Sequence, residues 1–211
     1  MLSFYNLVNN VVYGISGEVK HEAVIKAFKE GYIVHIAEDF NWLPSKATEK
    51  SHGLDCRVKI KDSKIVRIDS ESKKKTIICT DNEFYTMKDN YYRFDLGIRL
   101  LTPDYLRPEL KPRSSLAAKK GLLFATSGII DNDYFEPLLF GTFAVRNDKL
   151  EDGERIAQLI YYGDFQKYLR GKEGLIFQVV DSYMYNNLPE IMDKYGLKTD
   201  RDGGYGHTGS K

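Results

Sequence analysis

The chain has 211 residues, of which 42% are hydrophobic and 29% charged, a composition typical of a globular protein and not of a disordered one. Its 31 Lys and Arg residues balance 30 Asp and Glu residues, which disfavours a protein that coats nucleic acid. Two cysteines, Cys56 and Cys79, exclude a disulfide framework and a CxxC metal knuckle. Because the sequence shows neither a signal peptide nor an apolar run of about 18 residues, we expect a soluble cytoplasmic protein (host cytoplasm if viral) without nucleic-acid or membrane partners.

Short apolar runs, several of which alternate with polar residues at period two, predict many β-strands. The runs are residues 32–36, 56–60, 64–68, 76–80, 91–100, 138–140, 142–145, 156–160 and 175–180. Turn residues separate them, and the charged segment 69–75 is typical of a solvated hairpin tip. The sequence therefore predicts a mainly β domain, of the jelly-roll or barrel class.

Two segments predict short helices. Residues 18–29 place apolar side chains on one face and end before Gly31, and residues 188–195 end before Gly196. A glycine just after the last helical residue is a common helix stop.

The C-terminal segment 203–209 has four glycines and one ring, Tyr205. Such a segment loses much backbone entropy when it becomes ordered and has little apolar surface to bury. It is either a free tail or a flap that closes over a ligand, with the ring stacking on a base.

Three interior stretches carry polar groups that suit nucleotide chemistry. Residues 112–117 group Arg113 with two hydroxyls, a set of donors for phosphate oxygens. Residues 128–134 set Asp131 three residues before an aromatic ring, and residues 153–160 place a single amide in an apolar run. Each stretch also has a purely structural explanation: a surface ion pair, a turn residue, or a polar group at a strand edge.

Taken together and in order, these stretches resemble the motifs of the trimeric deoxyuridine triphosphate nucleotidohydrolase (dUTPase) family. The first motif resembles Ser51-His-Gly-Leu-Asp-Cys56, and the others are similar to the stretches at 112–117, 128–134, 153–160 and the glycine-rich tail. The resemblance implies a trimeric dUTPase-like jelly roll with one or two short helices and a C-terminal flap. We expect an N-terminal extension over residues 1–40 packed on the core, a β domain over 41–197 and a flap over 198–211.

The resemblance also implies roles for individual residues. Asp131 is expected to be the general base that activates the water attacking the α-phosphorus. Tyr134 is expected beneath the deoxyribose, where it leaves no room for a 2′-hydroxyl. The residues expected to hold the phosphate chain are Arg113, Ser114, Ser115 and Gln158.

Further roles concern the metal, the base and the tail. Asp55 is expected to orient a water on Mg²⁺ that the triphosphate carries, and backbone groups at 126–130 are expected to read uracil. In the tail, Tyr205 is expected to stack on uracil. The remaining residues expected to contact substrate are Gly128, Ile130, Arg201, Gly204, His207 and Thr208.

The family's activity implies hydrolysis of dUTP to dUMP and pyrophosphate in a homotrimer with shared active sites. A dCTP deaminase of the same fold, a pyrophosphatase for modified pyrimidine nucleotides and a non-enzymatic regulatory binder remain alternatives. Deamination is disfavoured because Ala118 and Gly141 stand where that enzyme has an arginine and a glutamate.

The chain departs from the family pattern at several places. Phe135-Glu-Pro137 replaces the usual x-Gly-Glu, and Arg201 lies one place later than the usual tail arginine. The unmatched segments 1–40 and 161–197 are consistent with an enlarged, phage-type member, and a regulatory protein could bind them.

Overall fold

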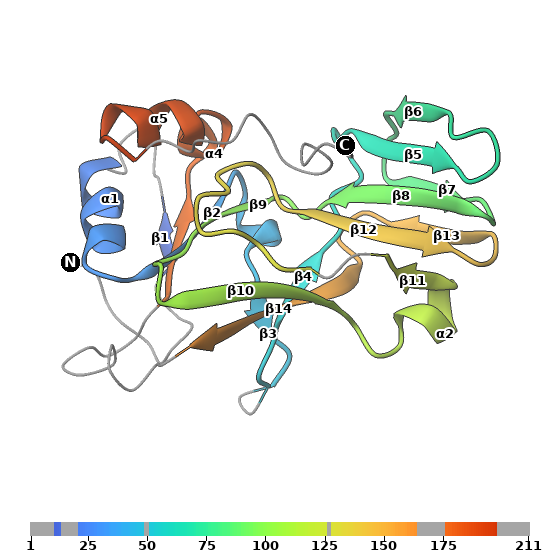
Figure 1. The fold of residues 1–211 in the computed structure, drawn as a ribbon, viewed down its shortest axis with the longest axis horizontal. Helices are drawn as coiled ribbons and strands as arrows, with labels where there is room; N and C mark the ends of the chain where they lie inside the picture. Colours follow the sequence, from blue (N-terminus) through green and yellow to red (C-terminus); the bar gives the residue numbers. More distant parts are fainter. Residues whose placement is uncertain (1–10, 14–20, 49–50, 126–127, 164–175, 198–211) are drawn as a thin grey trace, which may run out of the picture.

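The structure is a computed structural model that describes residues 11–13, 21–48, 51–125, 128–163 and 176–197. Most of its regular structure is β, arranged in four sheets of antiparallel or mixed strands (Figure 1). The strands are β1 (Val11–Tyr13), β2 (Ile33–Ala37), β3 (Ser45–Lys46), β4 (Leu54–Arg57), β5 (Ile65–Asp69), β6 (Lys75–Ile78), β7 (Glu83–Thr86), β8 (Asn90–Asp95), β9 (Ile98–Leu101), β10 (Leu106–Pro112), β11 (Leu122–Phe124), β12 (Leu139–Ala144), β13 (Asp148–Glu151), β14 (Arg155–Gly163) and β15 (Ile176–Val180).

Three antiparallel sheets enclose the main core. Their strand orders are β10-β14-β4-β3, β11-β12-β8-β5-β6 and β13-β7. The alternating pattern of β8 buries Tyr92 and Phe94 side by side, with ring centroids 5.7 Å apart. Leu54 and Leu159 reach the same core from the second sheet. This confirms the prediction of a mainly β, jelly-roll-like domain.

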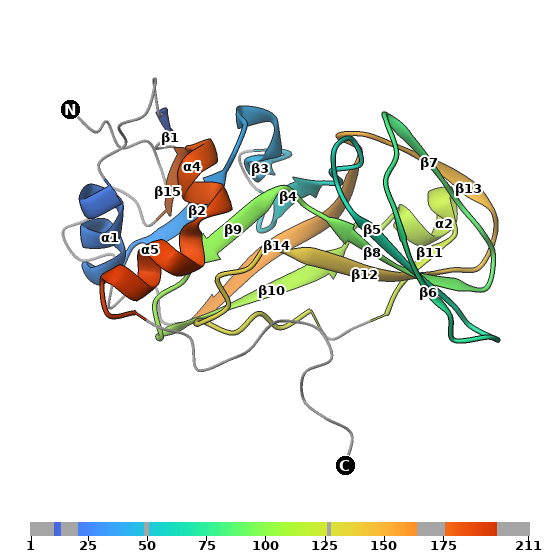
Figure 2. The same cartoon turned by 90° about the horizontal axis from the view of Figure 1, so that it is seen from above.

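The fourth sheet has the order β1-β15-β2-β9, with β1, β15 and β2 parallel and β9 antiparallel. All five residues of β2 are buried, as expected for a strand covered on both faces. Three helices lie beside this sheet at one end of the molecule: α1 (His21–Lys29), α4 (Ser182–Asn186) and α5 (Leu188–Lys194) (Figures 1 and 2). Together they form a second apolar cluster, which we call the helical cluster; its buried members are Val24, Ile25, Ala27, Val34, Ile36, Leu101, Phe135, Phe177, Val179, Met184, Tyr185, Leu188, Ile191 and Met192.

The predicted helices are confirmed where the structure describes them. Gly31 and Gly196, which follow α1 and α5, have φ values of 86° and 71°, so both chain reversals use the left-handed region. Two further short helices were not predicted: α4, and α2 (Leu116–Lys120) at the end of the molecule opposite α1 and α5 (Figure 2). A single 3₁₀ turn spans Phe40–Trp42.

The strand predictions hold in outline but differ at glycines. The run 91–100 is divided into β8 and β9 by Gly97, whose φ is 67° and whose N–H donates to Asp95 Oδ1 over 2.7 Å. The runs 138–140 and 142–145 instead join through Gly141 into the single strand β12. The segment 69–75 forms the predicted hairpin tip between β5 and β6. Among the described residues, no helix is long and apolar enough to cross a membrane.

Candidate active site

The register of β14 and β4 places an amide opposite a carboxylate. Gln158 pairs with Asp55 across these strands, and its Nε2 donates to Asp55 Oδ1 over 3.1 Å. Asp55 is 1% exposed, so its charge needs compensation inside the protein. The strand pairing therefore makes Asp55 the centre of a polar cluster on the second sheet.

Two guanidinium groups supply that compensation. Arg113 Nε lies 3.4 Å from Asp55 Oδ1, and Arg155 Nη1 lies 3.2 Å from Asp55 Oδ2. The Arg113 N–H also donates to Ile156 O over 3.2 Å, which fixes the backbone just after β10. One carboxylate thus holds two arginines in place, and the arginines keep further donors for another anion.

A pocket of about 320 Å³ opens beside these arginines. It is lined by Arg57, Arg113, Ser115, Leu116, Lys119, Lys120, Gly153, Glu154 and Arg155. Five of these side chains are cationic, and Glu154 neutralises one of them by pairing with Lys120 Nζ at 2.9 Å. The excess of positive charge and the Ser115 hydroxyl suit the pocket to a polyphosphate.

The segment 128–130 lies along the other edge of β10. Leu110 N donates to Gly128 O over 2.7 Å, and Ile130 N donates to Pro108 O over 3.1 Å. Gly128 has a φ of 71°, and a Cβ placed on it would lie 2.0 Å from Leu110 O. Glycine is therefore required where this segment approaches β10.

A tight turn follows, and it carries the predicted base and ring. Asp131 is exposed, and its carbonyl accepts the Tyr134 N–H over 3.1 Å. The Tyr134 ring packs against the main core, and its hydroxyl donates to Pro137 O over 3.0 Å. Between them, Asn132 Nδ2 lies within hydrogen-bond distance of three carbonyl oxygens, those of Thr102, Pro103 and Leu106, at 3.1, 2.7 and 2.9 Å.

The structure separates the predicted site residues into two groups within one chain. The bonds of Ile130 and Asn132 place Asp131 beside the 106–108 end of β10, whereas Arg113 follows the other end. Six residues of extended chain separate Arg107 from Arg113, which corresponds to about 20 Å. Asp55, Arg113, Ser115 and Gln158 therefore form one group, and Asp131 and Tyr134 form another beside the opposite end of β10.

Some predicted residues are not in either group, and some participants were not predicted. Ser114 is exposed beside the pocket, and the tail residues Arg201, Gly204, Tyr205, His207 and Thr208 lie outside the described residues. Arg155 was missed as a site residue, although its position within the 153–160 stretch is a usable signal. Asn132 was missed because its three carbonyl partners lie 26 to 30 residues away in sequence.

Comparisons with known proteins fit this arrangement of motifs. A family model described as dUTPase matches residues 77–174. The deoxyuridine 5′-triphosphate nucleotidohydrolase of Haemophilus influenzae is 32% identical over 145 residues, which cover 63% of this chain and 83% of that protein. The chain belongs to the dUTPase family.

A second relative matches a longer part of the chain. The enzyme of the same name from Psychromonas ingrahamii is 26% identical over 171 residues, covering 79% of this chain and 87% of that protein. Among solved structures, the dUTPase of Streptococcus mutans is 21% identical with a TM-score of 0.46, and the match covers 60% of this chain and 89% of that one. The dUTPase family model includes Arg113, Asp131 and Gln158, whereas α1, α4 and α5 lie outside it.

Proposed function

We propose that this chain hydrolyses dUTP to dUMP and pyrophosphate. The observation that carries the proposal is the cluster in which Asp55 holds Gln158 and two arginines, Arg113 and Arg155, that line a cationic pocket. Arginine donors match the geometry of phosphate oxygens, and charge neutralisation and positioning are most of what phosphoryl chemistry needs. Family membership supports the same reaction.

The phosphate chain would bind between α2 and the start of β14. Arg113 and Ser115 line the pocket directly, and exposed Ser114 lies beside them. Gln158 already uses one amide hydrogen on Asp55, so its second hydrogen is the donor left for a phosphate oxygen. Developing negative charge on the leaving pyrophosphate would then face fixed cations.

The residues present fit a magnesium ion that arrives with the nucleotide. Within the described ranges, no group of three His, Cys, Asp or Glu side chains could hold a metal ion alone. Mg²⁺ is commonly bound by one or two carboxylates together with substrate phosphates. Asp55 contacts three donor groups and has about four acceptor sites, so one acceptor site would remain to orient a metal-bound water. When bound, the ion would neutralise phosphate charge.

Asp131 would act as the general base, and its exposure leaves it accessible to a water molecule. Tyr134, held by its hydroxyl bond to Pro137, would support the deoxyribose and exclude a 2′-hydroxyl. For the base, the bonds of Gly128 O and Ile130 N to β10 turn the N–H and C=O of Ile129 away from that strand. We therefore assign the reading of the uracil edge to the backbone around Ile129, within the predicted 126–130 segment.

The separation of the two groups supports a homotrimer with shared sites. Arg113 and Asp131 of the same chain lie about 20 Å apart along β10. One nucleotide cannot contact both while its α-phosphorus faces the general base, Asp131. In a cyclic trimer, the phosphate-binding residues of one chain would lie next to the turn with Asp131 of a neighbouring chain. The third chain would supply its C-terminal tail. Tyr205 would then stack on the base, with Arg201, Gly204, His207 and Thr208 closing over the phosphates. The domain boundaries at 40/41 and 197/198 are part of this proposal.

One assay tests the function. Purified protein is incubated with dUTP and Mg²⁺, and dUMP and pyrophosphate are measured, with Asp131→Asn as the control. The expected result is equimolar dUMP and pyrophosphate from the natural chain and a loss of about 10²-fold or more in the control, because an amide cannot accept the proton from water. Parallel reactions with dCTP, dTTP, UTP and 5-substituted dUTP separate the alternatives. Release of dUTP from dCTP would indicate a deaminase, and binding without turnover would indicate a regulatory protein.

A further inference from the structure

Phe135, which follows Tyr134, is buried in the helical cluster and not in the main core. Phe135 is 6% exposed and packs among residues contributed by α1, β2, β15, α4 and α5. Tyr134, one residue earlier, packs against the main core instead. The turn with Asp131 and Tyr134 therefore ends with one aromatic ring in each apolar cluster.

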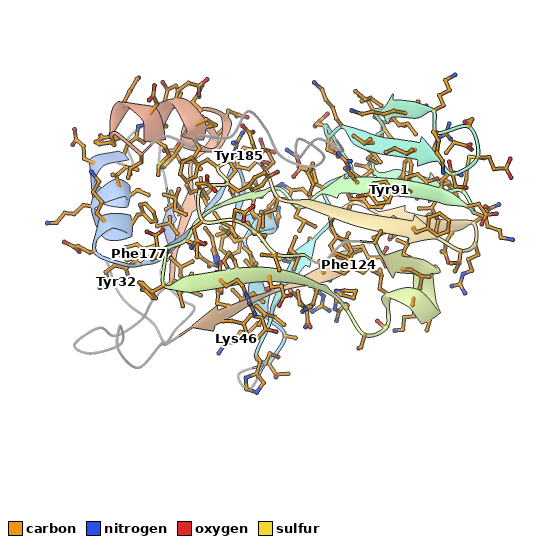
Figure 3. The ribbon with its side chains drawn as sticks, viewed as in Figure 1. Tyr32, Lys46, Tyr91, Phe124, Phe177 and Tyr185 are labelled. Atoms are coloured by element: carbon orange, nitrogen blue, oxygen red, sulfur yellow. The ribbon has the colours of Figure 1, made fainter. Side chains whose placement is uncertain are left out.

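Arg99 fixes the backbone of the same segment. It lies in β9, is 7% exposed, and its Nη1 donates to the carbonyl of Phe135 and lies 3.3 Å from Glu136 Oε2. Its guanidinium also lies over the Tyr185 ring of α4, at 5.4 Å from the ring centroid. A buried arginine thus connects the segment after the turn to a C-terminal helix. Figure 3 shows Tyr185 between the helical end and the strands.

The beginning and the end of the turn are held independently. Asn132 is anchored to the chain between β9 and β10, as described above, and Leu138 N donates to Ile98 O over 2.9 Å. Between Asn132 and Leu138, the Phe135 ring and the Arg99 donor hold the chain from the side of the helical cluster. Tyr134 lies within this stretch and is held from the side of the main core.

We propose that Phe135 and Arg99 are positioning residues for the turn with Asp131 and Tyr134, and that the helix-covered sheet is therefore part of what makes the site selective for deoxyribose. The inference rests on the proposed function. Phe135 occupies the variable position of the family's x-Gly-Glu stretch, and Glu136 and Pro137 replace the Gly-Glu that follows. Loss of the Phe135 ring from its seat would free Tyr134 to move, and a displacement of about 1 Å near reacting groups can cost about 10²-fold in rate.

The test compares Phe135→Leu and Phe135→Ala with Phe177→Leu and Phe177→Ala. Phe177 is buried in the same cluster, where its ring meets Tyr32 edge-on at 4.8 Å, but it lies on β15 and not on the turn (Figure 3). Each variant is measured for thermal stability, for kcat and KM with dUTP, and for the ratio of kcat/KM between dUTP and UTP. Arg99→Met removes the donors to the Phe135 carbonyl, and Arg99→Lys is the conservative partner expected to restore part of the effect.

The expected result is that Phe135 and Phe177 variants lose similar stability, while only the Phe135 variants lose kcat and at least about tenfold of the dUTP preference. Arg99→Met should follow Phe135→Leu. Equal stability losses with unchanged kcat and unchanged sugar preference in the Phe135 and Arg99 variants would overturn the proposal.

Hydrogen exchange of amides 128–138 in the nucleotide-free protein separates the two proposals, because it needs no activity. Faster exchange in Phe135→Leu and Arg99→Met, but not in Phe177→Leu, supports positioning even if the natural chain proves inactive on dUTP. If the natural chain hydrolyses dUTP but the Phe135→Leu and Arg99→Met variants show unchanged exchange and an unchanged sugar preference, Phe135 and Arg99 do not have this role.

Discussion

The side chains of Gln158 and Asp55 are bonded across neighbouring strands, with Gln158 Nε2 3.1 Å from a carboxylate that is 1% exposed. Asp55 has three partners in this cluster: the Gln158 amide is neutral, whereas Arg113 and Arg155 are positively charged. Asp55 therefore carries one negative charge against two guanidinium groups, and Gln158 leaves that balance unchanged.

Changing Gln158 to Glu tests that balance. A second carboxylate opposite Asp55 removes the hydrogen bond and adds like-charge repulsion, so we expect stability to fall by about 1–3 kcal/mol and kcat/KM by about 10²-fold. Gln158→Met, of similar length but neutral, serves as the control and should retain more stability than Gln158→Glu. Urea unfolding and dUTP kinetics measure both. Equal stability of the two variants would show that Asp55 does not sense charge at position 158.

Mixing two inactive variants tests whether the active site is shared. Asp131→Asn chains and Arg113→Ala chains are unfolded together and refolded as mixed oligomers. If Arg113 and Asp131 of one site come from different chains, random assembly restores about a quarter of the sites. Each variant refolded alone is the control. Mixed oligomers without recovered activity would place both residues in a site of one chain.

Replacing Gly128 or Gly153 by alanine distinguishes the cost of a steric clash from the cost of a positive φ. A Cβ at position 128 would lie 2.0 Å from the Leu110 carbonyl oxygen, whereas nothing lies within 4 Å of one at position 153. Both residues have positive φ, at 71° and 78°, so Gly153→Ala should cost only about 1–2 kcal/mol in free energy of unfolding. Gly128→Ala should cost more and should also weaken nucleotide binding, because the segment must leave β10. Similar unfolding curves for the two variants would contradict this reading of the close approach.

His35 predicts a pH dependence of stability. It is fully buried in β2, with Nε2 2.7 Å from Tyr161 Oη, and burial lowers its pKa from 6.5 to about 3. Between about pH 6.5 and pH 3, His35 is protonated in the unfolded chain but remains neutral in the folded chain. The contribution of neutral His35 to the free energy of unfolding is therefore full above about pH 6.5 and is lost as the pH falls toward 3.

Comparison with His35→Gln isolates that contribution. Between pH 7.5 and pH 5, the natural chain should lose about 2 kcal/mol more than the variant, which has no group titrating at this position. Unfolding in urea at both pH values and at one protein concentration measures the difference. The same loss in both proteins would show that protonation of His35 does not drive the effect.

Local sequence signals predicted the helices α1 and α5 and most strands, because apolar spacing and terminal glycines act over a few residues. The strand β10 was missed since Pro108 and Pro112 argue against a strand interior. In the structure the Pro108 carbonyl accepts the Ile130 N–H, so this proline sits where the 128–130 segment approaches β10. The sequence alone does not reveal which segment a strand edge will meet.

The site shows the same limit. The residue types at Asp55, Arg113 and Gln158 were predicted, but the bond between Gln158 and Asp55 depends on a strand register that joins positions 103 residues apart. The seat of Phe135 was not predicted because its neighbours come from both ends of the chain. Conversely, the spacing within the 128–134 stretch was informative, since a turn places both of its functional groups locally.

The strand β15 lies between β1 and β2, although it comes after every other strand in the part of the chain that the structure describes. During synthesis on the ribosome, β1 and β2 therefore lack their shared neighbour in the sheet until residues 176–180 emerge. A chain released early would retain Arg113, Asp131 and Gln158 but would lack β15, α4 and α5, which build much of the seat for Phe135. Burial of the Phe135 ring therefore waits until the residues of β15, α4 and α5 have emerged.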